Sequence, residues 1–416
     1  MACVEGIGLT DADLAILELE SLAVAGHTCK VVLLGAGAPT AEHLRAAIAE
    51  RLAAVPAMTR RLAGPADRPA WIHDDRFDIA AHVVAAQAQP GDDASLRAEV
   101  ARLFAERLDR SRPLWRIDVL QRPDGGAALV WRIHHALADG TVAMRFADAV
   151  LWDADPNPAV PRAPAAHTDD ARRRGRLAAF VRHELALGPE HSPFDGAIGS
   201  GREVAFAHAP LRELHDAAKR LAGATVNDAV LTAVAGGLRA WIEHYHGRLG
   251  RVRVKIPVSL HHPGEDDGNR DSFFTLELPL GEPDAVTRLS AIRAATAVRK
   301  ADHDAETLDL LMRDLARASP QLERFCRRLE ASPRTFALNV SNVPGPPRPV
   351  AVLGAPVDAV YSIAEIGERH ALRIAVVSLA GRLHFGFCSD PEIVGDLGVL
   401  ARGVEADAAA LVAAAR

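Results

Sequence analysis

The chain has 416 residues, of which 49% are apolar and 25% are charged, so it is long enough for two or three compact units with large cores. Its formal net charge of −6, with arginines scattered along the sequence, argues against nucleic acid as a partner. The four cysteines lie far apart without C-x-x-C spacing, so neither a disulfide framework nor a zinc site is expected. No metal ion is therefore predicted.

The sequence contains no predicted membrane span. No apolar run reaches the roughly 18 residues that a span requires, and no basic-then-apolar signal segment opens the chain. A cytoplasmic location is therefore expected. The basic run at 172–176 is interpreted as a solvated helix face, with contact to an anionic lipid surface as the alternative. Contact with a membrane or a lipid droplet would then be peripheral.

Residues 1–155 are predicted to form one α/β unit. Thr10 and Thr40 are expected to cap two helices, the second over residues 40–52. A third helix is predicted at 96–108, and strands are predicted at 29–34, 60–62, 82–84, 116–120 and 127–131. The sequence Pro-Asp-Gly-Gly at 123–126 predicts a turn between the last two strands.

Residues 156–203 are predicted to be a connector, because they are rich in proline and alanine. A second α/β unit is predicted over 204–416, with strands at 202–208, 252–259 and 273–278, helices at 210–222, 225–245, 284–298 and 306–316, and a hairpin at 371–387. Gly236 and Gly237 lower the helix propensity of the apolar segment 225–245, so another backbone is expected to pack closely there. Two α/β domains that face each other across a cleft are the predicted architecture.

The most specific pattern is His-His-x-x-x-Asp-Gly at residues 134–140. It follows an apolar strand and precedes an amphipathic segment at 141–152, so it occupies a strand-to-helix loop that can present reactive groups to a cavity. A histidine there can take a proton from a hydroxyl or a thiol near neutral pH. Two surface histidines in an ordinary loop are the favoured interpretation of a lone His pair, but the whole pattern is more specific.

Five further stretches accompany this pattern in a characteristic order. The six stretches are Leu114-Trp115 within Arg-Pro-Leu-Trp, then residues 134–140, 227–231 (Asn-Asp-Ala-Val-Leu), 257–260 (Pro-Val-Ser-Leu), 268–270 (Gly-Asn-Arg) and 339–346 (Asn-Val-Ser-Asn-Val-Pro-Gly-Pro). Each stretch alone is weak evidence, but together they cover most of the chain. In this order they resemble the bacterial wax ester synthase/diacylglycerol acyltransferase family.

The resemblance implies both a fold and a reaction. The fold is α/β, with two chloramphenicol-acetyltransferase-like domains whose mixed sheets are flanked by helices, and with an active-site tunnel at their interface. The reaction is transfer of a long-chain acyl group from acyl-CoA to a fatty alcohol, which gives a wax ester, or to a diacylglycerol, which gives a triacylglycerol. Acyl-CoA is a substrate in this scheme, and no cofactor is expected.

The resemblance also assigns roles within the motif. Because a thioester is already activated, the reaction needs a base more than a covalent nucleophile. His135 is expected to take the proton of the acceptor hydroxyl and return it to the departing thiolate. His134 is expected to shape the loop, Asp139 to hold it, and Gly140 to let the backbone turn.

The other matched residues are expected near the substrates or in the supporting structure. Asn227 and the backbone of the motif loop are equal candidates for stabilising the oxyanion, although a helix N-terminus is the favoured role of Asn227. Ser341 and Asn342 are expected to order a strand end, with a place in the tunnel wall as the alternative. Leu114 and Trp115 are expected to pack in the core first and to line the acyl pocket second.

The chain departs from the family pattern in three ways. His261 stands where the family has an arginine soon after Pro-Val-Ser, which questions a salt bridge from Asp139 to that position. His261 and His262 are not expected to share a metal ion, since adjacent strand residues point to opposite faces. The connector is short for the family, and an aromatic content of 5% offers few side chains for anchoring in lipid.

Two alternatives remain beside the leading function. The first is a related transferase or condensation-type enzyme that acylates a different hydroxyl or an amine, with the acyl group delivered from a carrier protein. The second is a catalytically inactive member that binds acyl chains or a partner protein. The intact residues His135, Asp139 and Gly140 argue against the second alternative.

Overall fold

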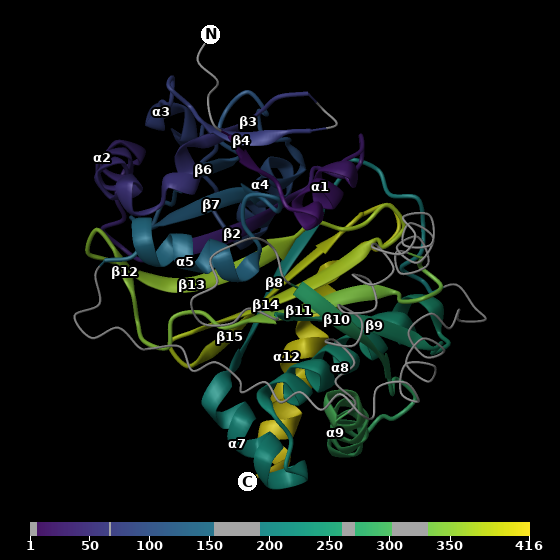
Figure 1. The fold of residues 1–416 in the computed structure, drawn as a ribbon. Helices are drawn as coiled ribbons and strands as arrows, with labels where there is room; N and C mark the ends of the chain where they lie inside the picture. The colour runs from purple at the N-terminus through teal and green to yellow at the C-terminus, as the bar shows by residue number, and fades with distance from the viewer. Residues whose placement is uncertain (1–5, 66–67, 154–191, 260–270, 302–331) are drawn as a thin grey trace.

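The computed structural model describes residues 6–65, 68–153, 192–259, 271–301 and 332–416 (Figure 1). Its architecture is mixed α/β, as predicted, with two six-stranded sheets and a three-stranded one. The small sheet has the order β1 (Ile7–Gly8), β4 (Ala70–His73), β3 (Arg60–Ala63). Near it lie α1 (Asp11–Glu18), α3 (Ile79–His82) and two 3₁₀ turns (Leu52–Ala54 and Pro56–Thr59).

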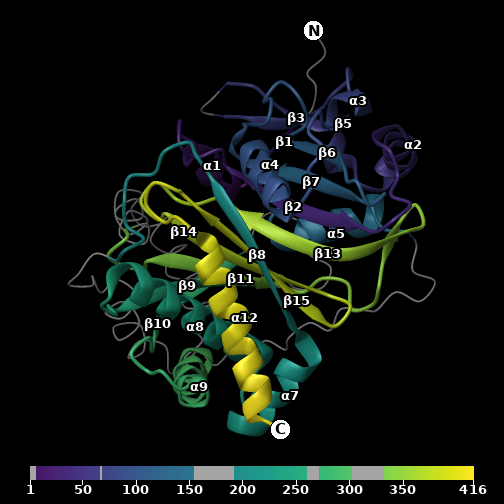
Figure 2. The ribbon, with the colours of Figure 1, turned by 180° about the vertical axis from the view of Figure 1, so that it is seen from behind.

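The first large sheet carries the motif. Its order is β12 (Ala351–Val352), β13 (Ala355–Ala364), β2 (His27–Leu34), β7 (Ala127–His134), β6 (Trp115–Gln121), β5 (Val83–Ala85). Every residue of β7 is buried, because helices cover both faces of the sheet and the strand is accordingly almost continuously apolar. Helices α2 (Ala41–Arg51) and α5 (Gly140–Val150) pack on one face, and α4 (Asp93–Ala105) packs on the other (Figures 1 and 2).

The second large sheet is also mixed. Its order is β10 (Asp271–Leu278), β9 (Val252–Ser259), β11 (Leu338–Val343), β14 (Leu372–Leu379), β15 (Arg382–Ser389), β8 (Glu203–Pro210). Strand β11 runs parallel to both of its neighbours, whereas the other pairs are antiparallel. Helices α8 (Val226–His246) and α12 (Leu397–Ala414) cover the outer face, with α7 (Leu211–Ala222) and α9 (Ala285–Ala301) beside them (Figure 2).

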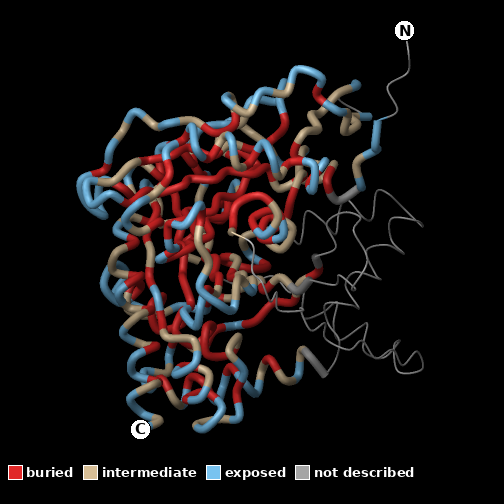
Figure 3. The backbone as a smooth tube through the Cα atoms, turned by 90° about the vertical axis from the view of Figure 1, so that its left-hand side faces the viewer, coloured by how far each residue is buried: buried red, intermediate tan, exposed pale blue. Residues whose placement is uncertain are grey.

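Strand β13 connects the two large sheets. Although it comes from the second half of the chain, it pairs antiparallel with β2, and Lys30 Nζ donates a hydrogen bond to Ser362 Oγ at 2.8 Å. Strand β15 of the other sheet passes directly over it, since a Cβ at Gly386 would overlap the carbonyl oxygen of Ser362. The buried residues of both sheets consequently lie in the middle of the molecule, with exposed residues around them (Figure 3).

The two glycines in α8 pack against another helix, as predicted. A Cβ at Gly237 would come within 2.8 Å of the Leu400 carbonyl oxygen and 2.5 Å of a Val404 methyl, both on α12. Gly403 of α12 faces Gly237 in turn. The absence of side chains therefore lets the two helix backbones approach each other closely.

Most of the predicted elements are confirmed. Thr10, Thr40 and Thr225 each accept a hydrogen bond from the backbone N–H three residues later, so each caps the helix that it precedes. His82 ends the short helix α3 and does not begin a strand, which corrects the prediction at 82–84.

Some elements were missed, and some predictions cannot be compared with the structure. Strand β13 and helix α12 were not predicted. The predicted helix at 306–316 and most of the predicted connector lie outside the described residues. The domain boundaries at residues 155 and 203 stay a prediction.

Within the described part of the chain, no single helix is both long and apolar enough to cross a membrane. One bent pair, α7 with α8, reaches the required length and composition together. The buried residues of α8 belong to the hydrophobic core, as expected for an internal helix.

We expect Gly237→Ala to lower the free energy of unfolding by about 2 kcal/mol, because the backbone of α12 must move to admit the methyl group. Urea unfolding of the purified protein measures this change. Gly281→Ala serves as the control, since a Cβ there meets nothing within 4 Å, and it should change stability by less than about 0.5 kcal/mol. Equal effects of the two substitutions would contradict the packing explanation.

Candidate active site

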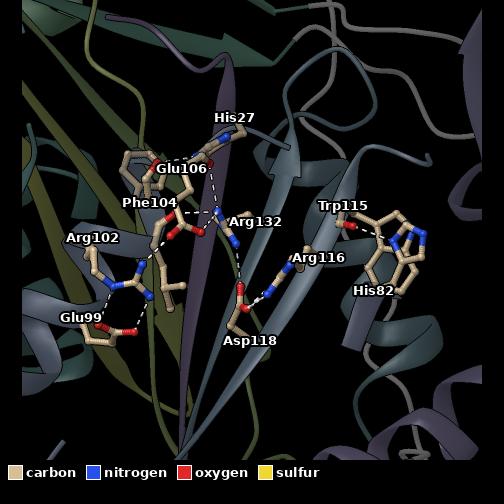
Figure 4. Close-up of polar contacts among 11 residues, drawn as sticks. His27, His82, Glu99, Arg102, Phe104, Glu106, Trp115, Arg116, Asp118 and Arg132 are labelled. Carbon is tan, nitrogen blue, oxygen red and sulfur yellow. Dashed lines mark hydrogen bonds and ion pairs between the residues drawn. The ribbon is translucent and has the colours of Figure 1, made fainter. Parts of the chain in front are cut away.

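The motif begins at the end of strand β7, which a buried arginine holds in place. Arg132, two residues before the motif, donates to Asp118 of β6 at 2.7 Å and to the backbone carbonyls of Leu103 and Glu106 at 2.6 and 2.9 Å (Figure 4). These bonds satisfy carbonyl groups at the end of α4 and neutralise a buried carboxylate. Strand β7 is thereby tied to both β6 and α4.

His134 is the last residue of β7, and all of its polar groups are used. Its backbone N–H donates to the Leu114 carbonyl at 2.9 Å, and its Nδ1 accepts the Ala136 N–H at 3.1 Å. Because Nδ1 is an acceptor, the proton of the neutral ring lies on Nε2, which donates to Glu20 Oε1 at 2.8 Å. His134 is thus held in one tautomer and shapes the loop.

Glu20 reaches the motif from the loop after α1. Its side chain is only 9% exposed, and it also forms ion pairs with Arg110 and, at 3.7 Å, with Arg107. Burial by itself would raise the pKa of Glu20, but hydrogen bonds from His134 and Arg110 outweigh burial and lower that pKa. Glu20 is therefore ionised at neutral pH and can only accept hydrogen bonds.

Gly26 leaves room for the contact between His134 and Glu20, because it has no side chain. Its φ of +74° is in the left-handed region, and a Cβ there would lie 2.7 Å from His134 Nε2 and 2.8 Å from Glu20 Cγ. Its carbonyl oxygen accepts the backbone N–H of His135 at 2.9 Å. Gly26 consequently permits the His134–Glu20 bond and also holds the backbone of His135.

His135 is half-buried at the start of the turn between β7 and α5. Burial is the main cause that lowers its pKa to about 4, and the positive charge of Arg373 on β14 lowers it further. Asp139 and a hydrogen bond with the backbone of His135 itself oppose this shift. The imidazole is therefore neutral at pH 7, which is the form that can accept a proton.

Asp139 holds the loop by capping α5. Its side chain accepts the Val142 N–H at 2.7 Å, and the residue is 1% exposed. Gly140 follows as the first residue of the helix, where a Cβ would come within 3.1 Å of a Val343 methyl on β11. The motif loop of the first sheet thus contacts the end of β11 in the second.

Ser341 and Asn342 lie on β11 immediately before this contact and are half-buried. Their position at the end of β11 agrees with the predicted strand end, whereas their place in a tunnel wall stays a prediction. Asn227 is the second residue of α8, so its favoured position at a helix N-terminus is confirmed. Its role in stabilising the oxyanion stays a prediction, as does the tunnel between the domains.

Leu114 and Trp115 are fully buried beside the motif. The Leu114 carbonyl holds the His134 backbone, and the Trp115 indole donates to the Met58 carbonyl at 2.7 Å. The Trp115 ring stacks on His82 at a centroid distance of 4.6 Å (Figure 4). Both residues thus serve as core and support for the motif, and their role in the acyl pocket stays a prediction.

Sequence analysis missed Glu20 and Gly26, and it also missed Arg132 and Arg373. No spacing links Glu20 to a motif 114 residues later, whereas Gly26, three residues before the predicted strand at 29–34, was a usable, if general, signal. His261 lies outside the described residues. Among the residues that the structure describes, no group of three or more His, Cys, Asp or Glu side chains is arranged to hold a metal ion.

Comparison with known families shows which family has this sequence. Residues 9–187 match the wax ester synthase/diacylglycerol acyltransferase catalytic domain, and residues 267–411 match the WS/DGAT C-terminal domain. The chain belongs to this family. It is accordingly an acyltransferase, and its motif loop is the candidate active site of that enzyme.

Relatives with similar sequences agree with this assignment. A Mycobacterium tuberculosis protein described as a probable diacylglycerol O-acyltransferase, tgs2, is 31% identical over 361 residues, which cover 78% of the acyltransferase and 79% of the relative. A second, tgs1 of the same species, is 29% identical over 415 residues, which cover 90% and 89%.

Solved structures confirm the fold. The wax ester synthase/diacylglycerol acyltransferase from Marinobacter aquaeolei VT8 superposes with a TM-score of 0.72 at 24% identity, covering 98% of the acyltransferase and 99% of that chain. The first condensation domain of the calcium-dependent antibiotic synthetase has a TM-score of 0.66 at 18% identity, covering 100% and 97%. The predicted chloramphenicol-acetyltransferase-like architecture is therefore correct.

We expect Gly26→Ala to reduce acyl transfer on the order of 100-fold, because the methyl group would displace His134 from Glu20. Gly37→Ala is a matched control, since Gly37 has a φ of +84° but open space around it. Backbone strain should cost each variant about 1–2 kcal/mol of stability. Similar activity in the two folded variants would show that the space at Gly26 is unimportant.

Proposed function

We propose that the acyltransferase moves a long-chain acyl group from acyl-CoA to a fatty alcohol or a diacylglycerol, with His135 as the general base. The observation that carries this proposal is the state of His135, a neutral, half-buried imidazole held on a strand-to-helix turn in a chain of this family. The relatives described as diacylglycerol O-acyltransferases support the choice of acceptor.

The proposed chemistry needs only one proton carrier. As the acceptor oxygen attacks the thioester carbonyl, His135 takes the hydroxyl proton and a tetrahedral oxyanion forms. Collapse of this intermediate breaks the carbon–sulfur bond, and the imidazolium returns the proton to the CoA thiolate. Ester and free CoA are the products. Asp139 takes no part in proton transfer in this scheme, because its carboxylate caps α5.

Release of free CoA thiol from palmitoyl-CoA tests the proposal. The purified protein is assayed with hexadecanol, with a diacylglycerol and without acceptor. We expect acceptor-dependent release, and we expect His135→Ala to lower its rate by a factor on the order of 10²–10⁴, the usual contribution of a general base. His43→Ala, at an exposed position on α2, is the matched control.

The outcomes separate the alternatives. Release that depends on an acceptor and is lost only in His135→Ala supports the proposal and ranks the two lipids. Full activity of folded His135→Ala would remove His135 as the base. If neither lipid promotes release, other hydroxyl and amine acceptors and carrier-bound acyl groups become the substrates to screen.

The acid limb of the pH profile gives an independent prediction. Because the ring must be unprotonated, kcat/KM should be level at neutral pH and fall about tenfold per pH unit below the pKa of about 4. Arg373→Gln removes a positive charge that lowers this pKa, so its acid limb should move to higher pH. Arg382→Gln, exposed on the neighbouring strand, should leave the limb in place.

A further inference from the structure

Glu20 lies outside the motif, and its side chain is only 9% exposed. It is separated from His134 by 114 residues, yet its Oε1 lies 2.8 Å from His134 Nε2. Two residues earlier, Glu18 is exposed at the end of α1. A carboxylate shielded from water is unfavourable unless it has hydrogen-bonding partners. Because Glu18 faces solvent and the Glu20 side chain does not, the partners of Glu20 explain its inward position.

We propose that Glu20 is a positioning residue for acyl transfer, which acts by fixing the ring of His134 and thereby the turn that carries His135. This inference rests on the proposed role of His135. Glu20 is the acceptor of the Nε2–H, and the Ala136 N–H occupies Nδ1, so the ring has one tautomer and one orientation. If the acceptor at Nε2 is lost, only the bond from the Ala136 N–H still favours this tautomer and this ring orientation.

The His134 ring is connected directly to the backbone of the turn. The Ala136 N–H donates to Nδ1 of the ring. The N–H groups of Leu137 and Ala138 donate to the backbone carbonyl oxygen of His134 at 2.9 and 3.1 Å. His135 lies between these anchored residues, and its own N–H is held by Gly26. A rotation of the His134 ring would therefore break its bond to the Ala136 N–H, which belongs to the peptide group directly after His135.

The segment before β6 holds this arrangement at two points. Arg107 and Arg110 pair with Glu20, and the Leu114 carbonyl, four residues beyond Arg110, accepts the His134 N–H. Arg107 also donates to the Val24 carbonyl at 3.1 Å, which fixes the loop that carries Glu20. Hydrogen bonds from His134 and Arg110 lower the pKa of Glu20, so its carboxylate stays ionised and offers no proton that could compete with the Nε2–H.

Three variants test this role in the full-length protein. Glu20→Ala removes the acceptor, Glu20→Gln keeps an oxygen at the same position, and Glu18→Gln is the surface control. We expect Glu20→Ala to lower kcat on the order of 100-fold, with the KM values for acyl-CoA and acceptor changed less than about twofold. Glu20→Gln should recover most of the lost kcat, and Glu18→Gln should match the wild type.

Nitrogen NMR of histidine-labelled protein provides a readout that does not depend on activity. The His134 signal, identified by its loss in His134→Gln, should show the Nε2–H tautomer in the wild type and in Glu20→Gln. Glu20→Ala should show a mixture of tautomers. If Glu20→Ala proves too unstable to study, the tautomer and kcat of Glu20→Gln and Glu20→Asp serve the same purpose.

Two results would overturn the inference. One is a folded Glu20→Ala protein with unchanged kcat and an unchanged His134 tautomer. The other is equal loss of kcat in Glu20→Ala and Glu20→Gln while the tautomer stays as in the wild type, since the charge and not the acceptor would then be needed. If the wild type shows no acyl transfer at all, the proposed function fails, while the tautomer measurement still decides whether Glu20 controls His134.

Discussion

The antiparallel pairing of β13 with β2 is the constraint on which the site depends. It brings a strand from the second half of the chain into the sheet that ends in the motif, and Gly386 lets β15 cross over that strand closely. Glu365 follows β13 directly and accepts the Ala25 N–H at 3.0 Å, while it pairs with Arg202 at 2.9 Å. The same strand thus sets the sheets against each other and anchors the loop that contains Glu20 and Gly26.

This arrangement explains how two remote segments meet at one turn. The motif loop leaves β7 and contacts β11 through Gly140 and Val343. Arg373, on the strand next to β11, is close enough to His135 to lower its pKa. Each sheet therefore contributes to the state of His135: the first supplies its backbone position, and the second supplies part of its electrostatic surroundings.

Local features of the site were predictable, and long-range ones were not. Helix caps such as Thr40 and the strand-turn-helix pattern around residues 134–140 depend on neighbours within a few residues, so their signals are present in the sequence. The pairing of β13 with β2 and the bond from Glu20 to His134 depend on contacts between residues more than 100 positions apart in the sequence. The sequence around Glu20 does not indicate that His134 is its partner. Glu20 differs from the other glutamates through its low exposure, which exists only in the folded protein.

The position of β13 in the sequence also bears on the order of synthesis. Strands β2, β7 and β6 leave the ribosome long before residues 355–364, so β2 is at first an open edge with unpaired N–H and C=O groups. Its closure requires a contact of high sequence separation, and such contacts slow folding. The nascent first half is therefore exposed to wrong strand pairing while the second half is made, and the motif loop acquires its final support only when nearly the whole chain has been synthesised.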